Sequence, residues 1–207
     1  SLIPMGGVSS GDINKIPPAG QPSDIIFVGR LVRAKGIGTL LVAIHHLKRN
    51  RMEATLSIIG DGSDRDDLES QCHKLGIQDD VRFHGRVQDD SQVIGMMKSA
   101  KVFVYPAAPE GGWSISLIEA NACGLPAVSV RSGALGDNEA VIDGYNGLLA
   151  EEQSAEALGA KIRLVLEHQS LRMELGRNAR AFAQEQDWDN LTARVEDWYS
   201  RVARRAS

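Results

Sequence analysis

Cysteine is scarce in this sequence of 207 residues, and long apolar runs are absent. The two cysteines, Cys72 and Cys123, both lie in apolar helical patterns, so we expect two buried free thiols and no disulfide framework. No apolar run approaches the length of a membrane span. The first residues have neither the basic nor the apolar region of a signal peptide, and none is expected.

Positive charge is also in short supply. The chain has 23 Lys and Arg against 27 Asp and Glu, which gives a formal net charge of −4. Binding to a nucleic-acid backbone depends on a broad basic surface, so we expect no nucleic-acid partner. A local anion site remains compatible with this balance. The hydrophobic share of 43% is ordinary for a globular protein with a core.

Motifs for metal or nucleophilic chemistry are missing as well. The five histidines form neither H-E-x-x-H nor a Cys/His spacing, and there is no G-x-S-x-G elbow. Asp64-Arg65-Asp66 has the form of a metal-binding D-x-D. Acids in the first turn of a helix also complement its dipole, and we favour that interpretation, with Ser63 as the cap and no metal.

What the sequence does contain is a regular alternation of strand and helix patterns. Short apolar runs, several of them ended by glycine, predict strands at 25–29, 55–60, 81–85, 101–106, 126–130 and 147–150. Amphipathic helices separate most of these runs. Such alternation predicts a Rossmann-like, doubly wound parallel sheet of about six strands, with helices on both faces and a helical segment at the C-terminus.

Three segments follow from this pattern. Residues 1–24 are rich in Gly, Pro and Ser and are expected to be a linker or lead-in. Residues 25–187 are expected to form the Rossmann-like domain. Residues 188–207 are expected to form a C-terminal helix.

Candidate ligand-binding residues follow the predicted strands, because parallel sheets bind ligands at the carboxyl ends of their strands. Arg30 and Lys35 flank the turn after the first strand, beside a helix N-terminus, which suits an anion, although two surface cations would give the same pattern. After the other strands come glycines that permit close backbone approach: Gly60, Gly62, Gly111 and Gly112.

Glu119 stands out because it lies between apolar residues of a predicted helix. A carboxylate in such a position needs a partner. That partner is either a cation of a neighbouring loop or a pair of vicinal hydroxyls, as a ribose presents.

Five segments in order now show a family resemblance: F-V-G-R-L-V-R-A-K-G, I-I-G-D-G, V-R-F-H-G-R-V, E-G-G-W-S-I-S-L-I-E-A-N-A-C-G-L-P-A-V and V-I-D-G-Y-N-G-L-L. Together they resemble the C-terminal, donor-binding domain of the family 4 (group 1) retaining glycosyltransferases, which have the two-domain GT-B fold. The resemblance covers roughly residues 2–204. It implies that a hexose is transferred from a nucleotide-diphosphate sugar with retention of anomeric configuration, without a metal or other cofactor.

The resemblance also implies roles for individual residues. Arg30 and Lys35 would hold the diphosphate, and Gly29, Gly60 and Gly62 would belong to the donor-binding site. Gly85 and Arg86 would lie at the nucleobase, and Glu119 would bind the ribose hydroxyls. Glu110 would reach the transferred sugar and act in catalysis with Arg30 and Lys35. The backbone amides of Trp113, Ser114 and Ile115 would meet the phosphates, and Gly111 and Gly112 would belong to the same donor-binding site.

The spacing of the two glutamates departs from the family pattern. The family's motif has seven residues between its two acids, whereas Glu110 and Glu119 have eight between them. Counting back from Glu119 places Gly111 at the position of the first acid. Either the loop bulges by one residue or the acid has shifted register.

Three functions therefore stay open. The first is a glycosyltransferase whose acceptor-binding domain is absent here, so that the isolated chain would transfer little or no sugar. The second is a catalytically silent nucleotide-sugar-binding module, and the third is a non-hydrolysing nucleotide-sugar epimerase of related fold. A cytoplasmic location is expected, and peripheral association of the full-length protein with a membrane face stays open.

Overall fold

The chain folds around one parallel β-sheet. The computed structural model describes residues 8–107, 114–131, 140–193 and 195–196. The six strands lie in the order β3-β2-β1-β4-β5-β6, and every neighbouring pair is parallel. The strands are β1 (Ser23–Val28), β2 (Leu56–Ile59), β3 (Val81–Gly85), β4 (Ala100–Tyr105), β5 (Ala127–Val130) and β6 (Gly147–Ala150). The predicted sheet is confirmed.

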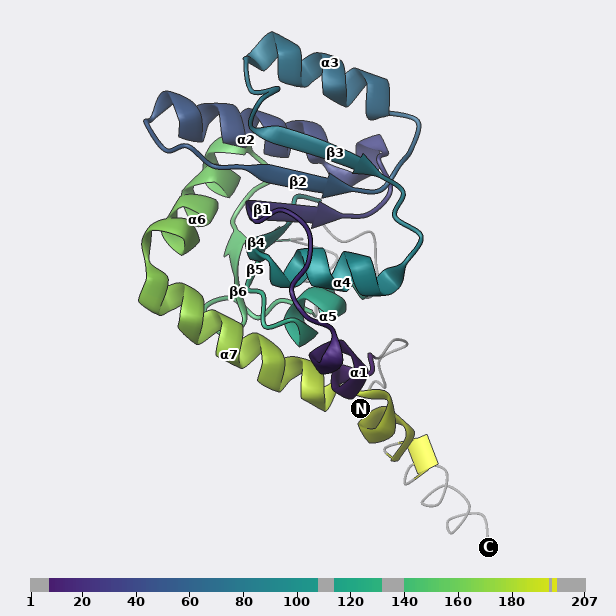
Figure 1. Cartoon of the computed structure of the whole chain (residues 1–207). Helices are drawn as coiled ribbons and strands as arrows, with labels where there is room; N and C mark the ends of the chain where they lie inside the picture. Colours follow the sequence, from purple (N-terminus) through teal and green to yellow (C-terminus); the bar gives the residue numbers. More distant parts are fainter. Residues whose placement is uncertain (1–7, 108–113, 132–139, 194, 197–207) are drawn as a thin grey trace, which may run out of the picture.

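Helices cover both faces of this sheet (Figure 1). One face carries α2 (Ile37–Arg49), α3 (Arg65–Leu75) and α6 (Ala155–Glu167). The other carries α1 (Ser10–Lys15), α4 (Asp90–Lys98) and α5 (Ile115–Ala122), while α7 (Gln169–Glu185) packs against both α5 and α6. No helix in the described part of the chain is long and apolar enough to cross a membrane.

The strand period explains why both faces are apolar. Successive side chains of a strand point to opposite faces. In β1, Ile25 and Phe27 belong to the core beneath α2, whereas Ile26, between them, belongs to the core beneath α4 and α5. All three are fully buried. A strand covered on both sides therefore appears in the sequence as a continuous apolar run.

The lead-in is more ordered than its composition predicted. Its residues 10–15 form α1, and the backbone N–H of Ser10 donates to the Asp187 carboxylate at 2.8 Å. The backbones of Val8 and Asp187 form an isolated parallel β-bridge, and the side chain of Ile13 is buried in the core. Such a short helix is marginal by itself, so these tertiary contacts stabilise it. They join the described start of the chain to the region that follows α7.

One predicted cap is wrong. Asp64, not Ser63, occupies the N-cap position of α3, and the Ser63 hydroxyl donates to the Asp64 carboxylate at 2.7 Å. The helix begins one residue later than a Ser63 cap would set it. At the other end, Gly76 closes α3 in the left-handed conformation with φ 67°, as predicted.

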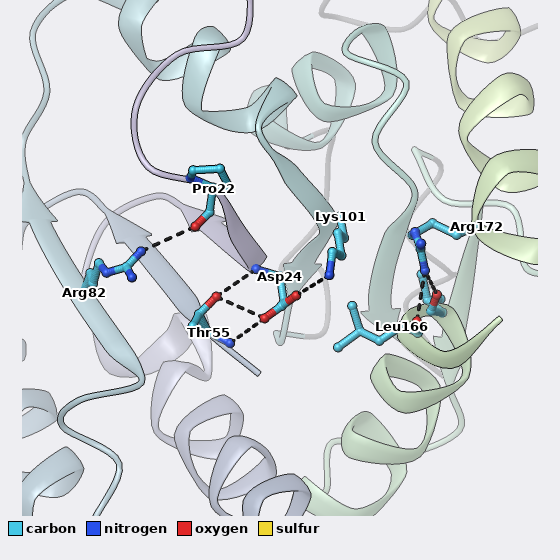
Figure 2. Close-up of polar contacts among 8 residues, drawn as sticks. Pro22, Asp24, Thr55, Arg82, Lys101, Leu166 and Arg172 are labelled. Atoms are coloured by element: carbon cyan, nitrogen blue, oxygen red, sulfur yellow. Dashed lines mark hydrogen bonds and ion pairs between the residues drawn. The ribbon is translucent and has the colours of Figure 1, made fainter. Parts of the chain in front are cut away.

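Polar contacts hold the sheet at its amino end (Figure 2). The backbone N–H of Asp24 donates to the Thr55 hydroxyl at 3.0 Å, and the N–H of Thr55 donates back to the Asp24 carboxylate at 2.9 Å. Lys101 Nζ donates to the same carboxylate at 2.7 Å. These bonds connect the starts of three adjacent strands, β2, β1 and β4. Arg172 of α7 donates to the carbonyls of Val165 and Leu166, which joins α7 to the end of α6.

Candidate functional site

A cavity of about 590 Å³ opens at the carboxyl end of the sheet. It lies where β1 has β2 on one side and β4 on the other, which is the point where the strand order reverses. Ligands of open α/β sheets bind at such a point, and the volume suits a small molecule. The cavity is lined by Val28, Gly29, Arg30, Ile59, Gly60, Asp61, Arg86, Val87, Asp90, Val93, Ile94 and Glu119.

Five of the predicted site residues line this one cavity: Gly29, Arg30, Gly60, Arg86 and Glu119. They come from four separate parts of the chain. Gly29 and Arg30 follow β1, Gly60 follows β2 and Arg86 follows β3, while Glu119 comes from α5. The carboxyl ends of parallel strands lie at one edge of the sheet, so residues far apart in sequence meet there.

Glu119 faces the cavity with its carboxylate unpaired. Within the part of the chain that the structure describes, the carboxylate makes no hydrogen bond or ion pair. Burial raises the pKa of Glu119 to about 7, and the nearby negative charge of Asp90 acts in the same direction. The salt bridge considered from the sequence is thus absent among the described residues. A buried carboxylate without a donor is suited to accept hydrogen bonds from a ligand.

Arg30 supplies positive charge at the same cavity. Its side chain is exposed and has no carboxylate partner among the described residues. Arg86 also lines the cavity. Arg65 lies nearby, but its Nε forms an ion pair with Glu69 Oε1 at 2.9 Å. A guanidinium that is not already paired can bind an anion without first breaking an internal contact.

Gly60 and Gly62, which follow β2, and Gly85, which ends β3, allow neighbouring loops to pack closely against one another. A Cβ on Gly60 would overlap the carbonyl group of Gly29, and a Cβ on Gly62 would overlap the backbone of Leu31. The N–H of Gly60 donates to the Gly85 carbonyl at 2.8 Å. Gly60 has φ 133°, which disfavours any side chain. These glycines therefore allow the loops after β1, β2 and β3 to pack closely around the cavity.

Lys35 lies outside the cavity lining. It ends the short 3₁₀ turn η1 (Arg33–Lys35), which carries it toward the end of β4. There its ammonium group donates a hydrogen bond to the Tyr105 hydroxyl at 2.8 Å. The side chain is partly buried. The structure thus places Lys35 beside β4, whereas Arg30 stays at the cavity that β1, β2 and β3 form.

The N-terminus of α5 marks the side of the site next to β4. Ser114 is its N-cap but makes no side-chain capping bond, and its hydroxyl lies 3.0 Å from that of Ser116. Ile115, the first helical residue, is 64% exposed. Four predicted site residues lie outside the described residues: Glu110, Gly111, Gly112 and Trp113.

Two buried asparagines hold α5 in place. The side-chain amide of Asn121 donates to the Ala140 carbonyl at 2.9 Å, and that of Asn146 donates to Asn121 at 3.1 Å. Both side chains are fully buried. Because these bonds are made two residues beyond Glu119, they help to fix the orientation of the helix that presents it.

About half of the cavity lining was not predicted from the sequence. Asp61 and Asp90 contribute carboxylates, and Val87, Val93 and Ile94 contribute an apolar wall. The apolar residues carry no chemical signal that separates them from core. Asp90, in the first turn of α4, has the pattern of an ordinary helix start.

Comparison with known proteins agrees with this geometry. The model of the family described as glycosyl transferases group 1 matches residues 10–182. An uncharacterized glycosyltransferase of Methanocaldococcus jannaschii is 32% identical over 178 residues, which are 86% of this chain and 48% of that protein. This chain therefore spans about half the length of that curated relative.

Two solved structures show the same fold. One is Anabaena HepE in complex with UDP, with a TM-score of 0.78 and 22% identity over 94% of this chain and 56% of that one. The other is the C-terminal domain of a glycosyl transferase group 1 family protein of Francisella tularensis, with a TM-score of 0.71 and 21% identity. It is matched over 87% of this chain and 98% of that one. The chain belongs to the group 1 glycosyl transferases and has the fold of their C-terminal, GT-B-type domain.

Proposed function

We propose that this chain is the donor-binding half of a retaining glycosyltransferase, which transfers a hexose from a nucleotide-diphosphate sugar. The observation that carries the proposal is that Glu119 and Arg30 line the same cavity and that neither side chain has a partner among the described residues. A nucleoside diphosphate presents the complementary groups, a vicinal diol and a diphosphate. Anabaena HepE, which shares the fold and was solved in complex with UDP, supports the same ligand class.

Each part of the donor has a proposed binding group. The ribose hydroxyls donate to Glu119, and the nucleobase lies by Gly85 and Arg86 against the apolar wall of Val87 and Val93. The diphosphate meets Arg30, Lys35 and the first N–H groups of α5, which have no side-chain cap from Ser114. The backbone of Trp113, Ser114 and Ile115 is proposed to donate there.

The chemistry follows from the charges. Cleavage of a sugar–diphosphate bond leaves negative charge on the phosphate oxygens and positive charge at the anomeric carbon. Arg30, Lys35 and the amides of α5 stabilise the leaving diphosphate, and loss of one such preorganised donor typically costs about 3–4 kcal/mol in the transition state. Glu110 is proposed to act on the sugar itself.

The binding of the acceptor and the cellular location are properties of the whole protein. Since the curated relative is about twice as long as the matched region, we propose that a further domain binds the acceptor and that this chain alone transfers little or no sugar. We also propose a cytoplasmic site of action. A measurable transfer rate by the 207-residue chain would contradict the first of these proposals.

The test is to map nucleotide binding onto the backbone. We would add UDP, GDP or ADP to the ¹⁵N-labelled chain and follow the amide resonances of Gly29, Gly60, Arg86 and Glu119. At least one of the three nucleotides should shift the resonances of all four amides, whereas the resonance of the distant Gly76 amide should not change. Shifts that spare the cavity, or none with any nucleotide, would contradict the proposal.

One alternative rests on a specific observation, the extra residue between Glu110 and Glu119. A binding module without catalysis would hold the nucleotide-sugar normally but lack a positioned first acid. In the full-length protein, the two functions differ in the effect of Glu110→Gln. Loss of transfer with unchanged donor binding supports the enzyme, and absence of transfer before the substitution supports the module.

A further inference from the structure

Tyr105 is the residue that fixes the position of the Lys35 ammonium group. Lys35 Nζ donates to the Tyr105 hydroxyl at 2.8 Å and lies 5.3 Å from the centre of the tyrosine ring. We infer that Tyr105 is a positioning residue, which holds Lys35 ready for the diphosphate of the donor. The inference rests on the proposed function and adds a residue that the sequence pattern predicted only as part of a strand.

Tyr105 is itself held firmly. It is the last residue of β4, it pairs with Ser129 of β5, and only 7% of its surface is exposed. Its ring belongs to the core on the α5 face of the sheet. The hydroxyl of such a ring has a fixed position, so it can fix the position of the ammonium group of a flexible lysine side chain. Lysine otherwise loses much rotamer freedom when it binds a ligand.

The backbone of Lys35 is fixed against the same end of β4. The N–H of Lys35 donates to the Val32 carbonyl at 2.8 Å, which closes the turn η1. The next residue, Gly36, has φ 66°, and a Cβ there would lie 2.7 Å from the Pro106 carbonyl oxygen. The turn therefore packs directly on the residue after Tyr105. Both the backbone and the ammonium end of Lys35 are thus positioned by consecutive residues, Tyr105 and Pro106.

The chemistry of the contact suits an anion site. A carboxylate partner would neutralise the ammonium, whereas a neutral phenol orients it and leaves its charge in place. Lys35 makes no ion pair with any carboxylate in the described ranges. An ammonium group has three N–H donors, and the hydroxyl of Tyr105 accepts from one. Two donors stay available for phosphate oxygens, and the electron-rich ring face also favours the cation.

The location links this contact to the rest of the site. β4 is the neighbour of β1 across the switch point, and α5 is the next described element after β4 in the chain. The diphosphate is proposed to lie between Arg30 and the N-terminus of α5. A cation held at the end of β4 is therefore proposed to contact the same diphosphate from the β4 side of the site.

The test separates binding of the phosphates from binding of the nucleoside. Tyr105→Phe removes the hydroxyl and keeps the buried ring, so the fold is retained, which a thermal melt would verify. We would measure the affinities of whichever of UDP and GDP binds more tightly and of its parent nucleoside. Tyr105→Phe should weaken the binding of the diphosphate by roughly three- to tenfold and leave the affinity for the nucleoside unchanged. Tyr145→Phe, at an exposed tyrosine that precedes β6, is the control and should change neither affinity.

A second comparison uses Lys35→Ala. If Tyr105 acts through Lys35, the double variant should bind the diphosphate no more weakly than Lys35→Ala alone. Additive losses, an equal loss of nucleoside affinity in Tyr105→Phe, or unchanged diphosphate affinity in that variant would each overturn the inference. If Lys35→Ala leaves the diphosphate affinity unchanged, the inference fails; if no nucleoside diphosphate binds the wild type, the proposed function itself fails. If Lys35→Ala weakens binding and Tyr105→Phe does not, only the role of Tyr105 is lost.

Discussion

The carboxylates of Glu119 and Asp90 line the same cavity, although they come from different helices, α5 and α4. Burial of Glu119, together with the negative charge of Asp90, raises the pKa of Glu119 to about 7. A ligand that donates two hydrogen bonds to this carboxylate stabilises its ionised form. Under the proposed function, ligand binding is therefore coupled to the loss of a proton.

This coupling predicts that donor affinity depends on pH. Below about pH 7 Glu119 is protonated in the free protein and accepts hydrogen bonds poorly, so affinity should fall about tenfold for each pH unit below its pKa. A nucleotide-sugar is the suitable probe, because a nucleoside diphosphate also has a terminal phosphate that titrates near neutrality. Calorimetry from about pH 5.5 to 8.5 would measure the effect. A flat profile would contradict it, and Glu119→Gln should itself give a flat profile.

The same pKa predicts that Glu119 destabilises the fold at alkaline pH. Its folded-state pKa lies above the unfolded value of about 4.5, so its contribution to stability is fully present below that value and is lost as pH rises through about 7. Glu119→Gln should raise the free energy of unfolding by about 2–3 kcal/mol at about pH 8 and change it little at about pH 4.5. Urea unfolding at both values would test this. The exposed Glu174→Gln is the matched control, and an equal gain there would contradict the account.

Asp24 should show the opposite dependence. Partial burial raises the pKa of Asp24, but the hydrogen bonds from Lys101 and Thr55 outweigh it and lower the pKa from its ordinary value. Its stabilising effect is therefore present at neutral pH and lost as pH falls below about 4. Asp24→Asn should cost about 1–2 kcal/mol at about pH 7, with the difference disappearing in acid. Lys101→Met removes only the exposed ion pair and should cost less than about 1 kcal/mol.

Gly60 should tolerate no side chain. Its φ of 133° and the closeness of the Gly29 carbonyl mean that Gly60→Ala must push apart the loops after β1 and β2. We expect a loss of about 2–4 kcal/mol and a weaker nucleotide site. Gly11→Ala is the control, because a Cβ there meets no atom within 4 Å and the position is helical, so this variant should keep or raise the stability, by up to about 1 kcal/mol. Wild-type stability of Gly60→Ala would show that the two loops are not packed as described.

The sheet could be predicted because most of its strands are buried on both faces, the edge strand β3 excepted. Runs such as Ile25–Phe27 and Val102–Val104 are continuous and apolar, and glycines mark where several of them end. α1 could not be predicted, because a six-residue helix with a glycine has little intrinsic stability and depends on contacts with residues after α7. Local composition carries no information about such distant partners.

The site was predictable only in part, for a related reason. A cation at a strand end directs attention to Arg30, the family resemblance implies Arg86, and Glu119 stands out as a carboxylate among the apolar residues of a helix. Tyr105 gave no such signal, because a tyrosine in an apolar run fits a strand core equally well. Its role becomes visible only from its bond with Lys35, which is 70 residues away in sequence.

The most direct measurement is a calorimetric titration of the chain with UDP and GDP, performed on the wild type, Arg30→Ala and Glu119→Ala. The account predicts that one nucleotide binds the wild type and that each substitution weakens it at least about tenfold, since each removes a hydrogen-bonding group at the cavity. Arg177→Ala, at an exposed arginine of α7 remote from the cavity, should bind as the wild type does. Binding that neither Arg30→Ala nor Glu119→Ala changes would contradict the account.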